Sequence, residues 1–380
     1  MKYIPLLLIA GLILSCSAKP ADEKKSETAF TDRELGQLLV IGFRGTEINP
    51  ESDITKNIKN LNLGGVILFD YDAESDSYGR NIESDDQLLK LASSLVAYSS
   101  NPPFIAIDQE GGQVSALKPR MGFPKTVSAQ YLGELDKEDS TRFYARQTAQ
   151  EFMVVGVNTN FAPVVDVNTN PKNPLITGYE RSYSSDPQKV AEHAGYVIDE
   201  FDVEGILTVL KHFPGHGSSA SGSRLEISDV TDSWSPDELI PYKTLFKEKT
   251  INAVMAGHIF NANIDPDWPA TLSHATINGL LRDSLGFEGV VFSDDMQMEA
   301  IQEKYGMETA IEQALNAGVD VLIFRNNHVY EEEIARQAID IIQKLIAEGK
   351  VSEETIQTSL NRIAKLKKDV IEDLCTCLNF

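Results

Sequence analysis

The feature of this 380-residue chain that most constrains its fold is a short apolar run followed by a helix-like stretch, repeated eight times. Each run is rich in Val, Ile and Leu and ends in glycine or polar residues. Continuous apolar runs of this length are typical of strands in a parallel sheet, because such a sheet is buried on both faces. Amphipathic stretches such as DPQKVAEHAGYVIDEF lie between the runs and have the periodicity of helices. The runs begin at Gln37, Gly64, Phe104, Val157, Gly205, Ile251, Glu288 and Gly318.

Eight strands alternating with helices predict a (β/α)8 TIM barrel, which is an α/β fold in a single domain. A doubly wound open sheet is the alternative. It more often has fewer strands and a glycine fingerprint after the first one, and EGGQV is not that fingerprint. We expect the barrel to span residues 30–373 and to be closed by the helical stretch SEETIQTSLNRIAKLKKDVIED. The segment DYDAESDSYG, residues 70–79, is expected to be an acidic surface insertion after the second strand.

The first 29 residues predict export and lipid anchoring. Lys2 supplies a positive charge, and the apolar run from Tyr3 to Leu14 is short for a membrane-spanning helix. The segment ILSC resembles the lipobox of bacterial lipoproteins, which implies a signal peptide over residues 1–15 and lipidation of Cys16. Residues 16–29 then form a polar tether, and acyl chains hold the secreted protein in the bacterial cell envelope. An ordinary signal peptide with a chance cysteine is the alternative.

The composition argues against a nucleic-acid partner, a disulfide framework and a zinc site. The net charge of −23 would be repelled by phosphates, so we expect no nucleic-acid partner. Three cysteines are too few for a disulfide framework. Cys375 and Cys377 have no further Cys or His nearby to complete a zinc site, so residues 374–380 are expected to be a frayed tail.

Charged and titratable residues follow most of the apolar runs. In a (β/α)8 barrel the C-terminal ends of the strands meet at one rim, and the active site lies there. A solvated loop tip would explain any one of these residues, but it does not explain the whole ring. The ring consists of Asp70, Asp108, Asp166, Lys211, His212, His258, Asp294, Asp295 and Arg325.

Three kinds of chemistry would suit this ring. Metal binding is disfavoured because the histidines follow separate strands or stand beside a lysine. Schiff-base chemistry is disfavoured because a lysine of that kind sits desolvated, whereas Lys211 is flanked by polar residues. Sugar chemistry needs a carboxylate nucleophile or base, an acid, and several donors that bind ring hydroxyls.

The chain resembles the bacterial β-N-acetylglucosaminidases of glycoside hydrolase family 3. The resemblance rests on KHFPGHG, AIDQEGG, FAPVVDVNTNP, ERSYSSDP and GVVFSDDMQMEAI, and it runs from about residue 30 to about residue 373. It implies a retaining enzyme that removes terminal β-linked sugars from a carbohydrate substrate. N-acetylglucosamine from peptidoglycan or related fragments is the expected sugar. The resemblance implies no metal and no organic cofactor. A family 3 β-glycosidase of other sugar specificity is an alternative.

The family's motifs assign roles to single residues. Asp294, the first aspartate of FSDDM, matches the nucleophile that forms a covalent glycosyl-enzyme. His258 matches a histidine at the end of the sixth strand, for which sugar binding and a structural part are equally compatible. Asp166 and His216 match residues with a structural part, the first orienting loops and the second bracing the PGHG turn. The substrate-binding set implied by the resemblance is Asp108, Arg181, Lys211, His212 and His258.

The loop after KHFPGHG departs from the family. Single-barrel members carry an Asp-Ser-His triplet there, in which the histidine is the general acid/base and the aspartate orients it. Here Gly222, Ser223 and Arg224 hold those places. Glycine has no side chain, and arginine stays protonated at any accessible pH, so the usual proton donor is absent. Gln113 also stands where the family commonly has an arginine.

Three explanations remain open. Another carboxylate supplies the proton, with Glu226 the nearest in sequence, Asp229 just beyond, and the acids of residues 72–76 within reach if that loop folds over the site. Alternatively, the enzyme is slow or limited to good leaving groups. In the third case catalysis is lost, and the chain is a sugar-binding lipoprotein.

Overall fold

The computed structural model describes residues 30–221 and 226–371, and within them the chain forms a closed parallel barrel. Each of the eight expected runs contributes a strand to the barrel, so the prediction of a (β/α)8 fold is confirmed. The strands are β1 (Leu39–Gly42), β2 (Gly65–Ile67), β5 (Phe104–Ile107), β8 (Thr159–Asn160), β9 (Leu207–Thr208) with β10 (Leu210–Phe213), β12 (Ala253–Ala256), β14 (Val290–Asp295) and β15 (Val321–Phe324).

The barrel closes through its fifth strand. β9 pairs with β8 on one side, and β10 pairs with β12 on the other. Only Val209 separates these two pieces, so they form one strand with a break in its ladder. The remaining neighbours pair in parallel from β12 through β14, β15, β1, β2 and β5 to β8. All eight C-terminal ends therefore open at one rim.

Side chains fill the interior of the barrel. Phe104 and Phe292 come from opposite strands, and their ring centroids lie 5.4 Å apart in an edge-to-face arrangement. Phe161 packs on Phe292 at 5.7 Å. Below them, the buried Nζ of Lys367 donates to Gln37 Oε1 at 2.9 Å and to the Gly64 carbonyl at 2.7 Å. Lys367 follows the last long helix, so this contact ties the C-terminal part of the chain to the floor of the barrel.

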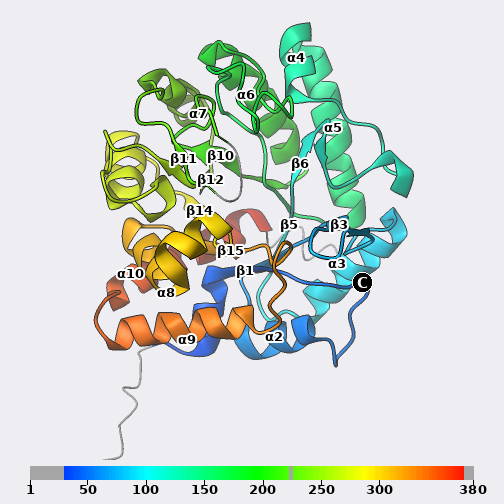
Figure 1. Ribbon diagram of the computed structural model, residues 1–380. Coiled ribbons are helices and arrows are strands. Elements are labelled where there is room, and N and C mark those ends of the chain that lie inside the picture. The colour runs from blue at the N-terminus through cyan, green and yellow to red at the C-terminus, as the bar shows by residue number, and fades with distance from the viewer. Residues whose placement is uncertain (1–29, 222–225, 372–380) are drawn as a thin grey trace, which may run out of the picture.

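Helices surround the strands (Figure 1). Their N-termini carry the expected caps: the Ser84 hydroxyl accepts from the Gln87 amide, and Asp186 accepts from the Gln188 amide. The helices are α1 (Asp32–Leu35), α2 (Asp53–Leu61), α3 (Asp85–Tyr98), α4 (Ala129–Leu135), α5 (Glu138–Val155), α6 (Pro187–Val203), α7 (Ile240–Glu248), α8 (Glu299–Ala317), α9 (Ile334–Ala347) and α10 (Glu353–Leu366).

Residues 70–79 are not a freely solvated insertion, which corrects the expectation from the sequence. They form a hairpin of β3 (Tyr71–Asp72) and β4 (Ser77–Tyr78). Asp72 is buried and receives two bonds from Arg44, at 2.7 and 3.0 Å, and one from Arg80 at 2.5 Å. Only the tip, residues 74–78, is exposed. Arg44 also binds Glu74, so two arginines and two acids of this region neutralise one another.

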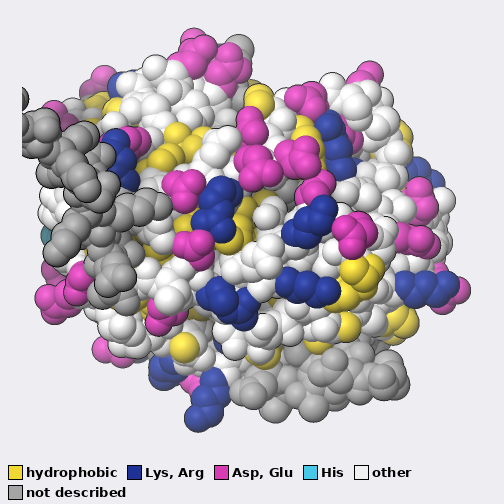
Figure 2. Space-filling view, turned by 90° about the horizontal axis from the view of Figure 1, so that it is seen from below, with side chains coloured by type: hydrophobic (Ala, Val, Ile, Leu, Met, Phe, Trp, Pro, Cys, Tyr) yellow, Lys and Arg dark blue, Asp and Glu magenta, His cyan; other side chains and the backbone are white. Residues whose placement is uncertain are grey.

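The charges on the face drawn in Figure 2 are mixed, with acidic and basic side chains interspersed. On that face, therefore, the acidic side chains behind the net charge of −23 do not form one continuous patch. Among residues 30–221 and 226–371, no helix is both long and apolar enough to span a bilayer.

Candidate active site

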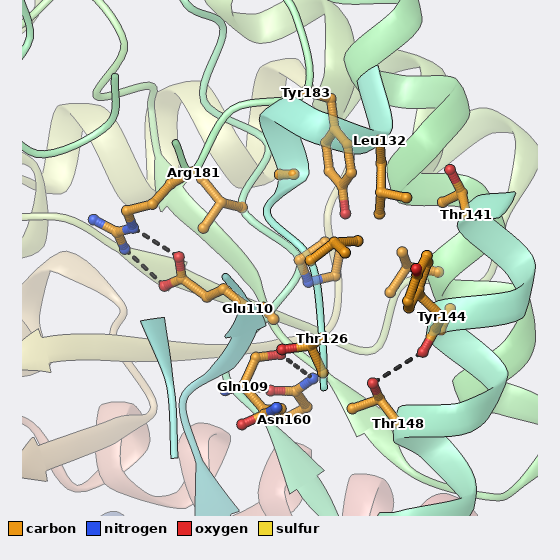
Figure 3. A pocket seen from close by; sticks show the side chains of 18 of the residues that line it. Gln109, Glu110, Thr126, Leu132, Thr141, Tyr144, Thr148, Asn160, Arg181 and Tyr183 are labelled. Carbon is orange, nitrogen blue, oxygen red and sulfur yellow. Dashed lines mark hydrogen bonds and ion pairs between the residues drawn. The ribbon is translucent and has the colours of Figure 1, made fainter. Parts of the chain in front are cut away.

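A chain of buried ion pairs crosses the C-terminal rim of the barrel. Lys211, on β10, contacts Asp108 Oδ1 and Glu110 Oε1, each at 2.7 Å from its Nζ. The Arg325 guanidinium binds the other oxygen of Asp108 at 2.7 Å. Arg181 holds Glu110 with two bonds, of 2.7 and 2.8 Å (Figure 3). Four residues that the sequence assigned to the rim or the substrate thus form one network. Glu110, which the sequence did not assign, connects Arg181 to the other three through Lys211.

This network keeps its carboxylates ionised in a buried place. Burial alone would raise the pKa of Asp108, but Lys211 and Arg325 outweigh it and hold that pKa well below the usual range. Burial likewise opposes ionisation of Glu110, and Arg181 and Lys211 reverse the effect, so that its pKa is also lowered. The rim therefore presents fixed charges of both signs, which suits the binding of several hydroxyl groups at once.

Asp294 lies near the end of β14 and remains partly exposed. Its Oδ1 accepts from the Asp295 amide at 2.7 Å, and no hydrogen bond to Oδ2 is present among the described residues. Burial would raise its pKa, but His258, His212 and Arg325 lower it to about 2. Asp294 is therefore an ionised carboxylate with one oxygen available to a ligand.

Asp295 has a different environment from its neighbour. It is buried, and its Oδ1 accepts from the backbone amides of Gln297 and Arg325, each at 3.1 Å. Burial raises its pKa. His258 supports the same turn, with its Nε2 3.0 Å from the Asp295 carbonyl oxygen. The two adjacent aspartates thus divide into one that faces the mouth of the barrel and one that ties β14 to β15.

Asp166 fixes the histidine ring next to the network. It lies fully buried, and its Oδ2 is 2.7 Å from Nδ1 of His212. Arg181 Nη2 lies 3.3 Å from Nε2 of the same ring. Because arginine can only donate, Nε2 accepts and the ring proton is on Nδ1, where it is donated to Asp166. The other oxygen of Asp166 accepts from the amides of His212 and His216, at 3.2 and 2.8 Å.

The PGHG turn is packed too tightly for any side chain larger than glycine. A Cβ on Gly217 would lie 1.6 Å from the Val167 carbonyl oxygen. Glu238, just before α7, accepts from the Gly217 amide at 2.9 Å and is completely buried. Burial raises the pKa of Glu238 to about 7. Glu238 therefore holds the PGHG turn, which follows Lys211 and His212 at the end of β10.

Glu226 follows that loop in the chain. It is exposed and lines a groove with Ile227 and with Ala300, Glu303 and Lys304 of α8. Two residues on, β11 (Ser228–Asp229) pairs in parallel with β13 (Ile259–Phe260), which follows His258 directly. This register holds Glu226 at the rim near the ends of β12 and β14. Gly222 and Arg224, the replaced members of the dyad, lie outside the described residues.

Sequence reasoning missed two carboxylates that the structure brings into the site. Glu110 lies in AIDQEGG, two residues after Asp108. That motif is the sequence feature that could have identified Glu110 as a site residue. Glu238 had no such signal, because SPDELIPYK has the composition of an exposed turn. Within residues 30–221 and 226–371, no group of three or more His, Cys, Asp or Glu side chains is arranged to hold a metal ion.

Comparison with known proteins agrees with this geometry. The model of the glycosyl hydrolase family 3 N-terminal domain matches residues 30–366, most of the chain. The fold and rim thus define a (β/α)8 barrel with a polar, carboxylate-rich mouth. The chain belongs to glycoside hydrolase family 3.

Its relatives are β-hexosaminidases by name. β-Hexosaminidase LpqI of Mycobacterium tuberculosis is 31% identical, over 88% of this chain and 82% of the relative. The structure of a family 3 β-N-acetylglucosaminidase from Paenibacillus sp. str. FPU-7 has a TM-score of 0.81 at 32% identity, over 91% of this chain and 64% of that one. β-Hexosaminidase A of Pseudoalteromonas piscicida is 30% identical, and the chain spans 61% of its length.

The first prediction concerns Glu110, which binds both Arg181 and Lys211 in the ion-pair network. Replacing Glu110 with Gln leaves the buried Arg181 and Lys211 short of a negative partner, so we expect the free energy of unfolding to fall by about 3 kcal/mol or more. Urea denaturation monitored by circular dichroism measures this. Glu138→Gln is the control, because its pair with Arg142 is half exposed and should be worth less than about 1 kcal/mol. Equal losses in the two variants would contradict the account.

The second prediction concerns Glu238 and pH. Its pKa is raised from 4.5 to about 7 in the folded protein, so its contribution to stability is complete below 4.5 and is lost as pH rises through about 7. Glu238→Gln stays neutral throughout. The melting temperature of the variant minus that of the wild type should therefore increase between about pH 5 and pH 8.

Glu248→Gln, an exposed change at the end of α7, is the matched control and should give a flat difference. A flat difference for Glu238→Gln as well would show that burial does not hold its proton.

Proposed function

We propose that the protein is a retaining β-N-acetylhexosaminidase that removes terminal β-linked N-acetylglucosamine from peptidoglycan or related amino-sugar fragments. The observation that carries the proposal is Asp294, an ionised carboxylate at the mouth of the barrel, one oxygen of which accepts no hydrogen bond from residues 30–221 or 226–371. A retaining enzyme needs such a group to attack the anomeric carbon and form a glycosyl-enzyme, which water then hydrolyses. The names of the relatives supply the sugar class.

The ion-pair network supports binding of a sugar ring beside Asp294. Asp108, Lys211 and Arg325 hold polar atoms in fixed positions, so little side-chain entropy is lost when hydroxyls bind. His212, fixed by Asp166, contributes a ring edge at the same rim. A hydroxyl can donate to Asp108 and accept from Lys211 without disturbing either ion pair, since each group has further hydrogen-bonding capacity.

Glu226 is our candidate for the general acid/base. The pairing of β11 with β13 anchors it on the side of the rim where β12 and β14 end, and β14 carries Asp294. Its exposure suits a group that must meet a leaving group. Glu303 shares the same groove and is the competing carboxylate.

The third prediction separates the nucleophile from the acid. Asp294→Ala should lose on the order of 10³-fold or more of turnover on both an activated aryl N-acetyl-β-glucosaminide and an unactivated disaccharide. Glu226→Gln should lose about 10² to 10⁴-fold on the disaccharide and little on the aryl substrate, because a good leaving group needs no proton. Steady-state kinetics of the soluble domain measure both.

Two controls sharpen this experiment. Asp283→Ala, an exposed aspartate before β14, should leave both activities unchanged. Glu303→Gln tests the competing carboxylate, and a loss there in place of Glu226 would move the acid role to α8. Wild-type protein without turnover on either substrate would contradict the proposal and favour a sugar-binding protein.

We further propose that Cys16 is lipidated and that the enzyme is anchored in the bacterial cell envelope. The described chain starts at Phe30, and α1 and the turn Gly36–Leu38 lead directly into the N-terminal end of β1. A tether entering there joins the barrel on the face opposite the active-site rim. An anchored enzyme would therefore keep its site turned away from the membrane.

The fourth prediction tests the anchor. In a bacterial host that processes lipoproteins, full-length protein should partition with the membrane fraction and incorporate labelled palmitate, and Cys16→Ser should do neither. Cys375→Ser is the control and should behave as the wild type. Wild-type protein found unlabelled in the soluble fraction would contradict the anchor while leaving the glycosidase proposal intact.

A further inference from the structure

A small cavity lies behind the ion-pair network, between the ends of β5 and β8 on one side and helices α5 and α6 on the other (Figure 3). Of the charged residues of the network, Glu110 and Arg181 line it. Its volume is about 40 Å³. Organic ligands occupy sites of several hundred Å³, whereas this volume has room for about two or three water molecules. Water is therefore the ligand that fits the cavity.

The hydroxyl of Tyr183 points into this cavity (Figure 3). The residue is 6% exposed, and no hydrogen bond joins its hydroxyl to residues 30–221 or 226–371. Burial, with the nearby charge of Glu110, raises the pKa of Tyr183, so the hydroxyl keeps its proton and can donate it. A buried polar group without a partner costs about 1–3 kcal/mol, and native proteins commonly satisfy such a group with ordered water.

The packing around Tyr183 fixes the position of this hydroxyl. Its ring stacks on the ring of His193 in α6, with the centroids 5.4 Å apart and 9° between the planes. His193 is itself held, because its Nδ1 lies 2.8 Å from Oγ1 of Thr141 in α5. The backbone of Tyr183 packs on α4, where a Cβ on Gly133 would lie 1.7 Å from the Tyr183 carbonyl oxygen. Both the ring and the backbone are thus constrained, and the hydroxyl stays at the cavity.

The cavity wall offers further hydrogen-bonding groups for water. Oε2 of Glu110 accepts one bond from the described residues, from Arg181 Nε at 2.7 Å, and a carboxylate oxygen can accept another. The Thr148 hydroxyl donates to the Tyr144 carbonyl at 2.9 Å and keeps its own lone pairs. A buried water needs two to four polar partners, and Tyr183, Glu110 and Thr148 can supply them.

We propose that this cavity is a binding site for ordered water, and that Tyr183 is a positioning residue that holds Glu110, through that water, in place for substrate binding. The second part rests on the proposed function, because it takes Arg181 and Lys211, the two partners of Glu110, to bind the sugar. Asp294 does not line the cavity. The water site therefore acts on the affinity for the sugar and not on the bond-breaking step.

The fifth prediction concerns Tyr183→Phe, which keeps the ring and removes only the hydroxyl. With an aryl N-acetyl-β-glucosaminide as substrate, we expect KM to rise about three- to tenfold, the loss of one hydrogen bond, while kcat stays within about twofold. Tyr131→Phe, at an exposed tyrosine on α4, is the matched control and should change neither constant. A lower melting temperature of Tyr183→Phe with an unchanged KM would overturn the positioning role, because a purely structural hydroxyl gives that result.

Crystal structures of the wild type and of Tyr183→Phe, at a resolution that shows ordered water, test the site without turnover. The wild type should hold water within hydrogen-bond distance of the Tyr183 hydroxyl and Glu110, and the variant should lose the molecule at residue 183. A wild-type cavity without water would overturn the inference and leave the proposed function standing.

Absence of wild-type turnover would instead overturn the proposed function. Calorimetry with N-acetylglucosamine then replaces KM as the readout. Binding weakened about three- to tenfold by Tyr183→Phe would support the water site and the positioning role on their own, and equal binding by the two proteins would overturn that role.

Discussion

The buried chain of ion pairs from Arg325 through Asp108, Lys211 and Glu110 to Arg181 is the interaction on which the rest of the site depends. Each of these charges costs several kcal/mol to remove from water, and only mutual pairing with close geometry compensates for that. Asp108 lies between β5 and β6 (Gln109–Gly111), and the other residues come from β6, β10 and the loops before α6 and after β15, so the pairing holds several separate elements in register. The rim is therefore a rigid polar surface.

The ionisation of Asp294 depends on this rigid rim. His258, His212 and Arg325 lower the pKa of this carboxylate, although burial opposes this, and the backbone amide of Asp295 donates to one of its oxygens. Asp295, one residue further along the strand, has its pKa raised by burial and binds backbone instead. Neighbouring residues of a strand point to opposite faces, so a single Asp-Asp pair supplies both a partly exposed carboxylate, which we propose as the nucleophile, and a structural tie. The protonation step is separate from this framework, and we assign it to the exposed edge where Glu226 lies.

The sequence predicted the barrel well because its strands are buried on both faces, and such strands must be continuous apolar runs. Asp108, Lys211 and Asp294 were found because a closed barrel brings all strand ends to one rim. Asp72 was expected in solvent and is buried, since its partners Arg44 and Arg80 become neighbours only after folding. Glu110 and Glu238 were missed for the same reason. Their burial depends on the direction of the side chain and on its tertiary partners, and the local sequence pattern reveals neither of these two features.

The most direct test of this account is to trap the glycosyl-enzyme. The soluble enzyme would be incubated with a fluorinated N-acetylglucosamine analogue that has an activated leaving group, then digested and examined by mass spectrometry. Because the fluorine slows release more than attack, the account predicts one sugar per protein molecule, carried by Asp294 in the peptide around VVFSDDMQMEA. An adduct on another carboxylate, or turnover of the analogue with no covalent species, would contradict it.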